Sequence, residues 1–279
     1  MDKRLLAATV LTAIMAWGAI VNAGPGNIKN TVHNMSSIAP PGFLGTRHWY
    51  SGETDQICIF CHTPHNAQPA QPLWNKVNPT QAFKMYTSSA TLTTVAKGVT
   101  APGPESLLCL SCHDGRTAIN ILHNSSVGVD AGGGKKKVGM GGGPLYTYDD
   151  PTSPEGIGVP MNIDNMTNPN DYRANLGKDA SNRFAGNNLM DDHPISFSYT
   201  AAYDEKGSAA LNAINIPKGQ GFRFFGSNNR MECSTCHDPH VDYGMDFDKN
   251  PTGTGNTALR PFLVRDNNGS AMCLACHNK

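Results

Sequence analysis

Every cysteine of the chain belongs to one repeated pattern, in which two cysteines are separated by two residues and followed at once by a histidine. The four copies span residues 58–62, 109–113, 233–237 and 273–277. Two cysteines three positions apart lie on one side of a helical turn, where their sulfurs can bond to the two vinyl groups of one porphyrin. The next histidine can then bind the iron from one face. The pattern therefore predicts four covalently attached c-type haems.

The haem-binding residues follow directly from the pattern. The predicted attachment residues are Cys58, Cys61, Cys109, Cys112, Cys233, Cys236, Cys273 and Cys276, and the predicted proximal iron ligands are His62, His113, His237 and His277. A cysteine pair alone is also compatible with a zinc site, a redox dithiol or a disulfide. None of these alternatives requires a histidine after the second cysteine. Histidine makes up only 10 of 279 residues, so chance does not explain its presence in all four copies. Haem attachment is therefore the favoured interpretation.

The amino terminus is typical of an exported protein. Lys3 and Arg4 precede an apolar stretch over residues 5–20, and the small residues at 21–23 form a cleavage site. We therefore predict a signal peptide over residues 1–23. Export agrees with haem attachment, which takes place outside the bacterial cytoplasm, and indicates an extracellular, outer-surface or periplasmic protein. No later segment is apolar enough for a membrane span, so none is expected in the mature chain.

Composition predicts a chain with little regular structure of its own. Charged residues make up 16% of the sequence, which also contains 29 glycines and 19 prolines. Apolar periodicity of helical length is hard to find. The expected fold is that of a multihaem cytochrome c: mostly irregular with short α-helices, low in secondary structure and cored by haem. The formal net charge is zero, so no nucleic-acid partner is expected.

The four motifs are of two kinds that alternate along the chain. Residues 58–65 and 233–240 share C-x-x-C-H-x-P-H, whereas 106–113 and 270–277 share S-x-x-C-L-x-C-H. The chain therefore resembles a tandem pair of two-haem units stitched into one domain by the haems. The predicted parts are a signal peptide 1–23, a first dihaem unit 24–128, a Gly/Asn-rich insertion 129–190 and a second dihaem unit 191–279. Within the predicted insertion, the glycine- and lysine-rich stretch 131–143 is expected to be a flexible surface loop.

The second axial ligand decides between a carrier and an enzyme. An iron with both axial positions filled by side chains exchanges electrons, whereas one with an open position can bind a small molecule. The histidines outside the motifs are His33, His48, His65, His123, His193 and His240, two more than four irons require.

His65 and His240 are the most informative of these, because each lies three residues after a proximal histidine. Such neighbours project to the same side of a helical turn, so neither can reach the opposite face of its own iron. As ligands they must serve a different haem.

His193 is the next candidate. Pro194 holds the backbone before it extended, and Asp191 or Asp192 could accept a hydrogen bond from its outer ring nitrogen. We predict the distal iron ligands to be His33, His65, His193 and His240. His48 beside Trp49 and Tyr50, and His123 after an apolar run, are expected to pack or cap instead.

The segments 58–65, 106–115, 191–197 and 232–240, together with 33–36, resemble the doubled-CxxCH tetrahaem c-type cytochromes, a cytochrome c3-like multihaem family of metal-reducing bacteria. In haem number the chain is similar to the extracellular tetrahaem cytochromes that form filaments. The resemblance implies bis-histidine ligation, low potentials and respiratory electron transfer outside the inner membrane. It implies redox proteins, extracellular acceptors or neighbouring copies as partners, and a possible homopolymer in which His33 serves a neighbour's haem.

The leading expectation is an electron carrier and not an enzyme. One alternative is a subunit of a polymeric extracellular cytochrome filament. Another is a multihaem reductase with one open iron, a class in which lysine often replaces a proximal histidine. The chain contains no Cys-x-x-Cys-Lys.

Overall fold

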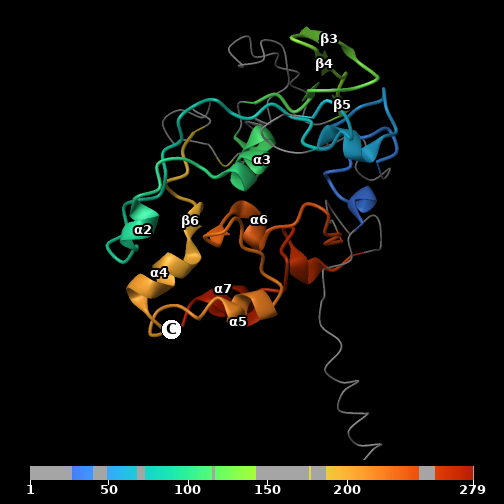
Figure 1. Ribbon diagram of the computed structural model, residues 1–279. Coiled ribbons are helices and arrows are strands. Elements are labelled where there is room, and N and C mark those ends of the chain that lie inside the picture. Colours follow the sequence, from blue (N-terminus) through green and yellow to red (C-terminus); the bar gives the residue numbers. More distant parts are fainter. Residues whose placement is uncertain are drawn as a thin grey trace, which may run out of the picture.

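The structure is a computed structural model that describes residues 27–39, 49–67, 73–114, 117–142, 176, 187–244 and 255–278. Short helices and strands are joined by long irregular segments (Figure 1). The expectation of short helices and low secondary-structure content is therefore confirmed. The predicted signal peptide, His48 and most of the predicted insertion after residue 142 lie outside the described residues.

The helices are short, and one turn or helix overlaps each cysteine motif. They are η1 (Ile28–Asn30), η3 (Ile57–Phe60), α2 (Thr94–Lys97), α3 (Pro104–His113), α4 (Tyr199–Lys206), α5 (Asn215–Gly219), α6 (Cys233–Cys236), η5 (Thr257–Leu259), η6 (Asn268–Ser270) and α7 (Ala271–Cys276). The four motifs lie on η3, α3, α6 and α7 in chain order. Within the described ranges, no helix combines the length and the apolar character that crossing a membrane requires.

The strands form three small antiparallel sheets. They are β1 (Trp49–Tyr50), β2 (Ile121–Leu122), β3 (Val129–Gly132), β4 (Lys135–Lys137), β5 (Gly141–Gly142), β6 (Phe197–Ser198) and β7 (Arg230–Met231). β1 pairs with β5, β6 pairs with β7, and β4 lies between β2 and β3.

The prediction of a flexible loop at 131–143 is wrong over its described part, residues 131–142. Gly133 and Gly134 turn the chain between β3 and β4 with φ angles of 59° and 80°, which a side chain at these positions would disfavour. The hairpin is held because β4 also pairs with β2, and Val138, just after β4, is fully buried. β2 lies in the predicted first unit, so the start of the predicted insertion continues a sheet of that unit.

The buried apolar residues form several small clusters instead of one large core. Phe60 and Leu122 lie in the cluster beneath the first motif, and Leu110 of α3 lies in another. Lys76 is fully buried, and its Nζ donates to the carbonyl oxygens of Ala118, Ile119 and Ile121 at 2.7–2.8 Å. These bonds tie the segment after the first motif to the strand region that follows the second.

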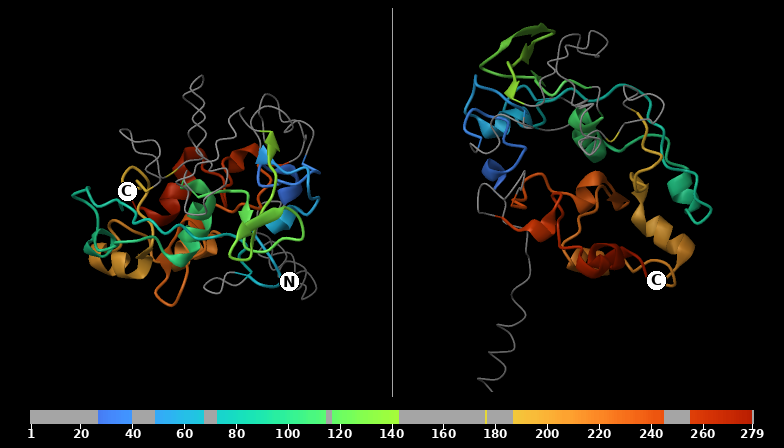
Figure 2. Two further views of the ribbon diagram at one scale, coloured as in Figure 1. Left: turned by 90° about the horizontal axis from the view of Figure 1, so that it is seen from above. Right: turned by 180° about the vertical axis from the view of Figure 1, so that it is seen from behind.

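α3 and α6 meet where the first and second halves of the chain face one another (Figures 1 and 2). The buried carboxylate of Glu232 accepts hydrogen bonds from Ser106 at 2.5 Å and from Ser196 at 2.7 Å. Arg230 joins Glu232 at 2.8 Å and Glu105 at 2.7 Å. The second and third motifs are therefore positioned by one polar network, with Glu232 at its centre.

Candidate functional site

The eight predicted attachment cysteines all lie in described segments, and none is joined in a disulfide. Burial raises the pKa of Cys61 to about 12, and the charge of Cys112 adds to the shift. Burial likewise raises the pKa of Cys236 to about 12, with a further contribution from Cys276. The first motif therefore has a cysteine of the second as a neighbour, and the third has one of the fourth.

The second and third motifs are linked in the same way across the α3–α6 junction. The side chains of Cys109 and Cys233 act on one another, which raises the pKa of the Cys109 thiol and lowers that of Cys233. Motifs that are consecutive in the sequence therefore have cysteines that influence one another, while the first motif also lies beside the third through His62 and His240.

Three of the four proximal histidines face a second histidine ring. The ring centroids are 6.1 Å apart for His33 and His113, 6.4 Å for His62 and His240, and 6.3 Å for His193 and His277. Each pair contains one histidine from a cysteine motif and one of the predicted distal ligands.

The spacing of these pairs fits an iron with two axial imidazoles. Two imidazole rings that bind one metal ion from opposite sides, each with a nitrogen about 2 Å from the metal, have centroids about 6 Å apart. Ordinary aromatic contacts cover the same range, so the distance alone does not distinguish them. The identity of the partners is more specific, because each of three motif histidines lies beside a different histidine from outside the motifs. These residues therefore fit a bis-histidine haem.

His33 is held inside its own chain. Its ring lies 4.4 Å from that of Phe262 and beside His113, and the neighbouring Asn27 N–H donates to the carbonyl of His240 at 3.0 Å. The amino-terminal segment thus packs on residues of the second half. In this arrangement the ring of His33 lies beside His113 of the same molecule.

His240 belongs to a chain of polar contacts. Its Nδ1 lies 2.8 Å from Asp238 Oδ1, and Arg223 donates to Asp238 Oδ2 at 3.2 Å. The bond from His240 is the main reason that the pKa of Asp238 is lowered to about 2, and the same bond raises the pKa of His240. The opposite ring, that of His62, has its pKa lowered by burial and by the charge of His240.

His193 finds a different partner from the expected carboxylate. Its Nδ1 lies 2.8 Å from the carbonyl oxygen of Pro194, the next residue. The acceptor beside this ring nitrogen is therefore a backbone carbonyl and not the side chain of Asp191 or Asp192. Burial raises the pKa of Asp192 to about 6, and the charge of Asp191 adds to the shift.

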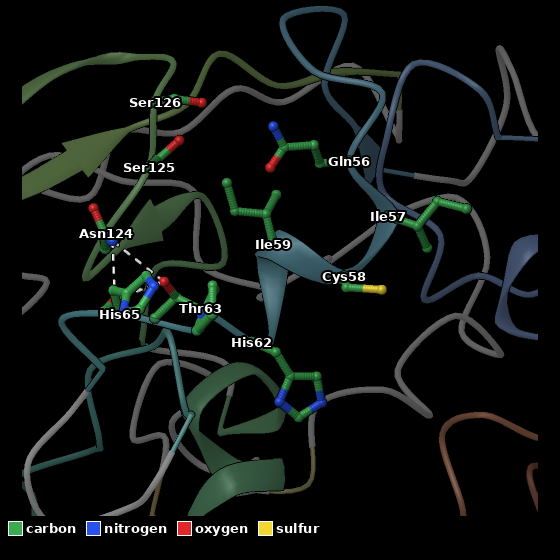
Figure 3. A pocket seen from close by; sticks show the side chains of 11 residues that line it. Gln56, Ile57, Cys58, Ile59, His62, Thr63, His65, Asn124, Ser125 and Ser126 are labelled. Atoms are coloured by element: carbon green, nitrogen blue, oxygen red, sulfur yellow. Dashed lines mark hydrogen bonds between the residues drawn. The ribbon is translucent and has the colours of Figure 1, made fainter.

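His65 and His237 have no such ring partner among the described residues. The Nδ1 of His237 lies 2.9 Å from the carbonyl oxygen of Pro261. His65 is exposed, and its carbonyl accepts bonds from Thr63 and Asn124 at 2.7 and 3.0 Å. Figure 3 shows the rings of His62 and His65 projecting in different directions. The expectation that His62 and His65 project to the same side of a helical turn is therefore wrong, because η3 ends at Phe60, before both residues.

A pocket of about 590 Å³ opens beside the first motif (Figure 3). Cys58, His62 and His65 line it together with residues 124–126. Its volume lies within the range of about 300–1,000 Å³ that is usual for small-molecule and cofactor sites. His123 lies next to this lining in the sequence, and its backbone N–H donates to the carbonyl of Asn75 at 2.8 Å.

Two contributors to the site were missed by the sequence reasoning. Asp238 was visible as the D of C-H-D-P-H, where the first motif has Thr63, but only the fold shows that it contacts His240. Phe262 left no signal, because its contact with His33 is set by the tertiary structure alone. A comparison with known protein families and with curated proteins found no match to this chain.

Proposed function

We propose that this chain is an exported tetrahaem c-type cytochrome that transfers electrons along four covalently bound, bis-histidine haems in anaerobic or extracellular respiration. The observation that carries the proposal is the matching of three proximal histidines with three different distal ones at 6.1–6.4 Å. Covalent attachment would use the two cysteines of each motif. A bound haem supplies reversible one-electron exchange between ferric and ferrous iron.

The arrangement of the motifs supports transfer between irons. Motifs that are consecutive in the sequence have cysteines close enough to shift one another's pKa. The network around Glu232 holds the middle pair of motifs together. Electron tunnelling falls steeply with distance, so a chain of adjacent motifs is the arrangement that conduction requires.

Within this proposal each ligand has a partner. His113 pairs with His33, His62 with His240, and His277 with His193. Of the predicted distal ligands His65 then remains for His237. The two C-x-x-C-H-x-P-H peptides would exchange histidines, so that each binds one haem directly and supplies the second ligand of the other.

The test is to express the full chain in a host competent in cytochrome maturation and to measure the molecular mass of the purified protein by mass spectrometry. We expect the mass of the processed polypeptide plus four haems, and ferric and ferrous spectra of low-spin bis-histidine iron. Colourless protein with the bare polypeptide mass would refute the proposal.

The same preparation separates the two alternatives. Uptake of one equivalent of carbon monoxide after reduction would indicate an open iron and favour a reductase. Electron microscopy of the material that the native cells secrete tests the filament alternative, because a filament subunit would be seen there as ordered polymers. Isolated particles at high protein concentration would count against that assembly.

A further inference from the structure

Two of the distal histidines proposed above, His240 and His193, differ in what lies behind their rings. Behind His240, the acceptor at Nδ1 is the carboxylate of Asp238 at 2.8 Å. Behind His193, it is a neutral backbone carbonyl, that of Pro194, also at 2.8 Å. The carboxylate is held in place on several sides: it accepts from the backbone N–H of His240 at 3.0 Å and from Arg223 at 3.2 Å.

The two C-x-x-C-H-x-P-H motifs differ at this same position. Asp238 of the third motif corresponds to Thr63 of the first. Threonine has no carboxylate, and the Thr63 hydroxyl donates to the backbone carbonyl of His65. Position 63 therefore offers the ring of His65 no carboxylate acceptor. The carboxylate therefore distinguishes two histidines that the repeat makes equivalent.

We propose that Asp238 is a positioning residue that lowers the potential of the iron bound by His62 and His240. This inference rests on the proposed function. A carboxylate that accepts the Nδ1 proton fixes the tautomer with Nε2 facing the metal and makes the ring a stronger electron donor. A stronger donor stabilises ferric iron more than ferrous iron, which lowers the potential. Arg223 withdraws part of that charge and limits the effect.

The ring planes offer a way to recognise this iron. The planes of His62 and His240 are 11° apart, whereas those of the other two pairs are 76° and 64° apart. Each imidazole donates π electrons into the iron d orbital that lies along its ring normal. Two parallel rings raise the energy of only one of the two iron d orbitals that can accept π electrons, so these two orbitals differ in energy. Nearly perpendicular rings raise the energy of both orbitals by about the same amount. The His62–His240 iron should therefore give a more rhombic ferric paramagnetic resonance signal than the other two.

The experiment is a redox titration of the holoprotein followed by electron paramagnetic resonance. In the parent protein the rhombic signal identifies the iron bound by His62 and His240. In Asp238→Asn that signal should move to a higher potential, with about a tenfold change in the reduction equilibrium, equivalent to about 59 mV for one electron. In Arg223→Ala it should move the opposite way, because the carboxylate keeps more of its charge.

The matched control is Asp204→Asn, which removes the same charge from the exposed side of α4. It should leave all signals in place. The inference is overturned if Asp238→Asn leaves the rhombic signal unchanged, or if all signals move together. Should Asp238→Asn fail to fold, an unchanged signal in Arg223→Ala overturns it. In each of these cases, four bound haems with low-spin spectra would leave the proposed function standing, whereas absence of haem would remove both.

Discussion

At the scale of single residues, His240 connects two parts of the chain. It comes from the peptide of the third motif, yet its ring faces His62 of the first at 6.4 Å. Local structure accounts for part of this, since α6 ends before His237, whose backbone is extended, and His240 lies in the turn that follows. The fold accounts for the rest by bringing the first motif to the ring. In the proposed protein this peptide would hold ligands of two different irons.

Replacing His240 with Met should alter one haem only. A thioether in place of imidazole raises the potential of the iron it binds, because sulfur stabilises the ferrous state. We expect one of the four reduction steps to move upwards and the ferric spectrum to lose one bis-histidine component, as measured by redox titration with optical and paramagnetic resonance detection. His123→Met is the control and should change neither. A His240→Met protein with the parent spectrum would show that His240 is not a ligand.

At the scale of elements, the polar contacts of Glu232 join α3 to α6. Its side chain caps α6 in a reciprocal arrangement with Thr235, and it also accepts from Ser106 of α3. The N–H of Cys233 in turn donates to Ser106 at 3.1 Å. A single buried carboxylate therefore sets both the start of the third motif and its contact with the second.

Glu232→Gln should loosen this junction. The amide keeps the size of the side chain but replaces an acceptor oxygen with a donor, so a buried hydroxyl or N–H loses its partner, at a cost of about 1–3 kcal/mol. We expect that loss in the free energy of denaturant unfolding, with faster amide exchange in α6. Glu105→Gln, which breaks only the part-exposed ion pair with Arg230, should cost less than about 1 kcal/mol. Equal effects of the two substitutions would contradict a central role for Glu232.

α2 is tied to α4 by another carboxylate. Glu205 of α4 accepts from the backbone N–H of Thr94 at 2.8 and 2.9 Å, at the amino-terminal end of α2. The N–H groups there carry partial positive charge, so they favour the ionised carboxyl. The bond from Thr94 is the main reason that the pKa of Glu205 is below its usual value of 4.5.

This contact predicts a pH-dependent difference between the parent and Glu205→Gln. A carboxyl whose pKa is lowered by folding adds stability above its unfolded pKa and loses that contribution as the pH falls through the folded one. The Tm of Glu205→Gln should therefore be lower than that of the parent at neutral pH, and the two should converge below about pH 4. A constant difference in Tm over this range would show that the bond does not depend on the charge. Asp204→Asn serves as the control, because it removes the neighbouring charge on α4 and leaves the bonds between Glu205 and Thr94 in place.

At the scale of the whole molecule, the chain has a divided apolar interior. Separate clusters centre on Phe60, Leu110, Ala202 and Val241, and the helices that carry the motifs run for ten residues or fewer. Small clusters bury little apolar surface relative to the entropy lost on folding. In the proposed holoprotein the porphyrins would supply apolar bulk between the motifs.

Haem attachment should therefore be required for cooperative folding. We expect the processed chain, made in a host that lacks cytochrome maturation, to lose the sharp urea transition of the four-haem protein and to show little amide protection. The holoprotein from the same gene is the control, and circular dichroism with amide exchange provides the measurement. A haem-free chain with a sharp transition at a similar urea concentration would show that the polypeptide folds on its own.

The sequence by itself determined the candidate attachment chemistry, because that chemistry is confined to five consecutive residues and needs no tertiary information. The low content of regular structure also followed from composition and from weak apolar periodicity. The stretch 131–142 was predicted wrongly, because its glycines are compatible with both a loop and a tight hairpin turn. Its pairing with β2 selects the hairpin.

Only the tertiary structure decided which histidines face one another. His33 and His113, or His62 and His240, are far apart in the chain, and local spacing can exclude a partner but cannot choose one. The polar support of His240 and His193 was likewise beyond the sequence, since a carboxylate and a carbonyl are both close in the chain and the backbone conformation selects between them. An axial pair joins two faces of one iron, so its members are chosen by the packing of distant segments, not by their order.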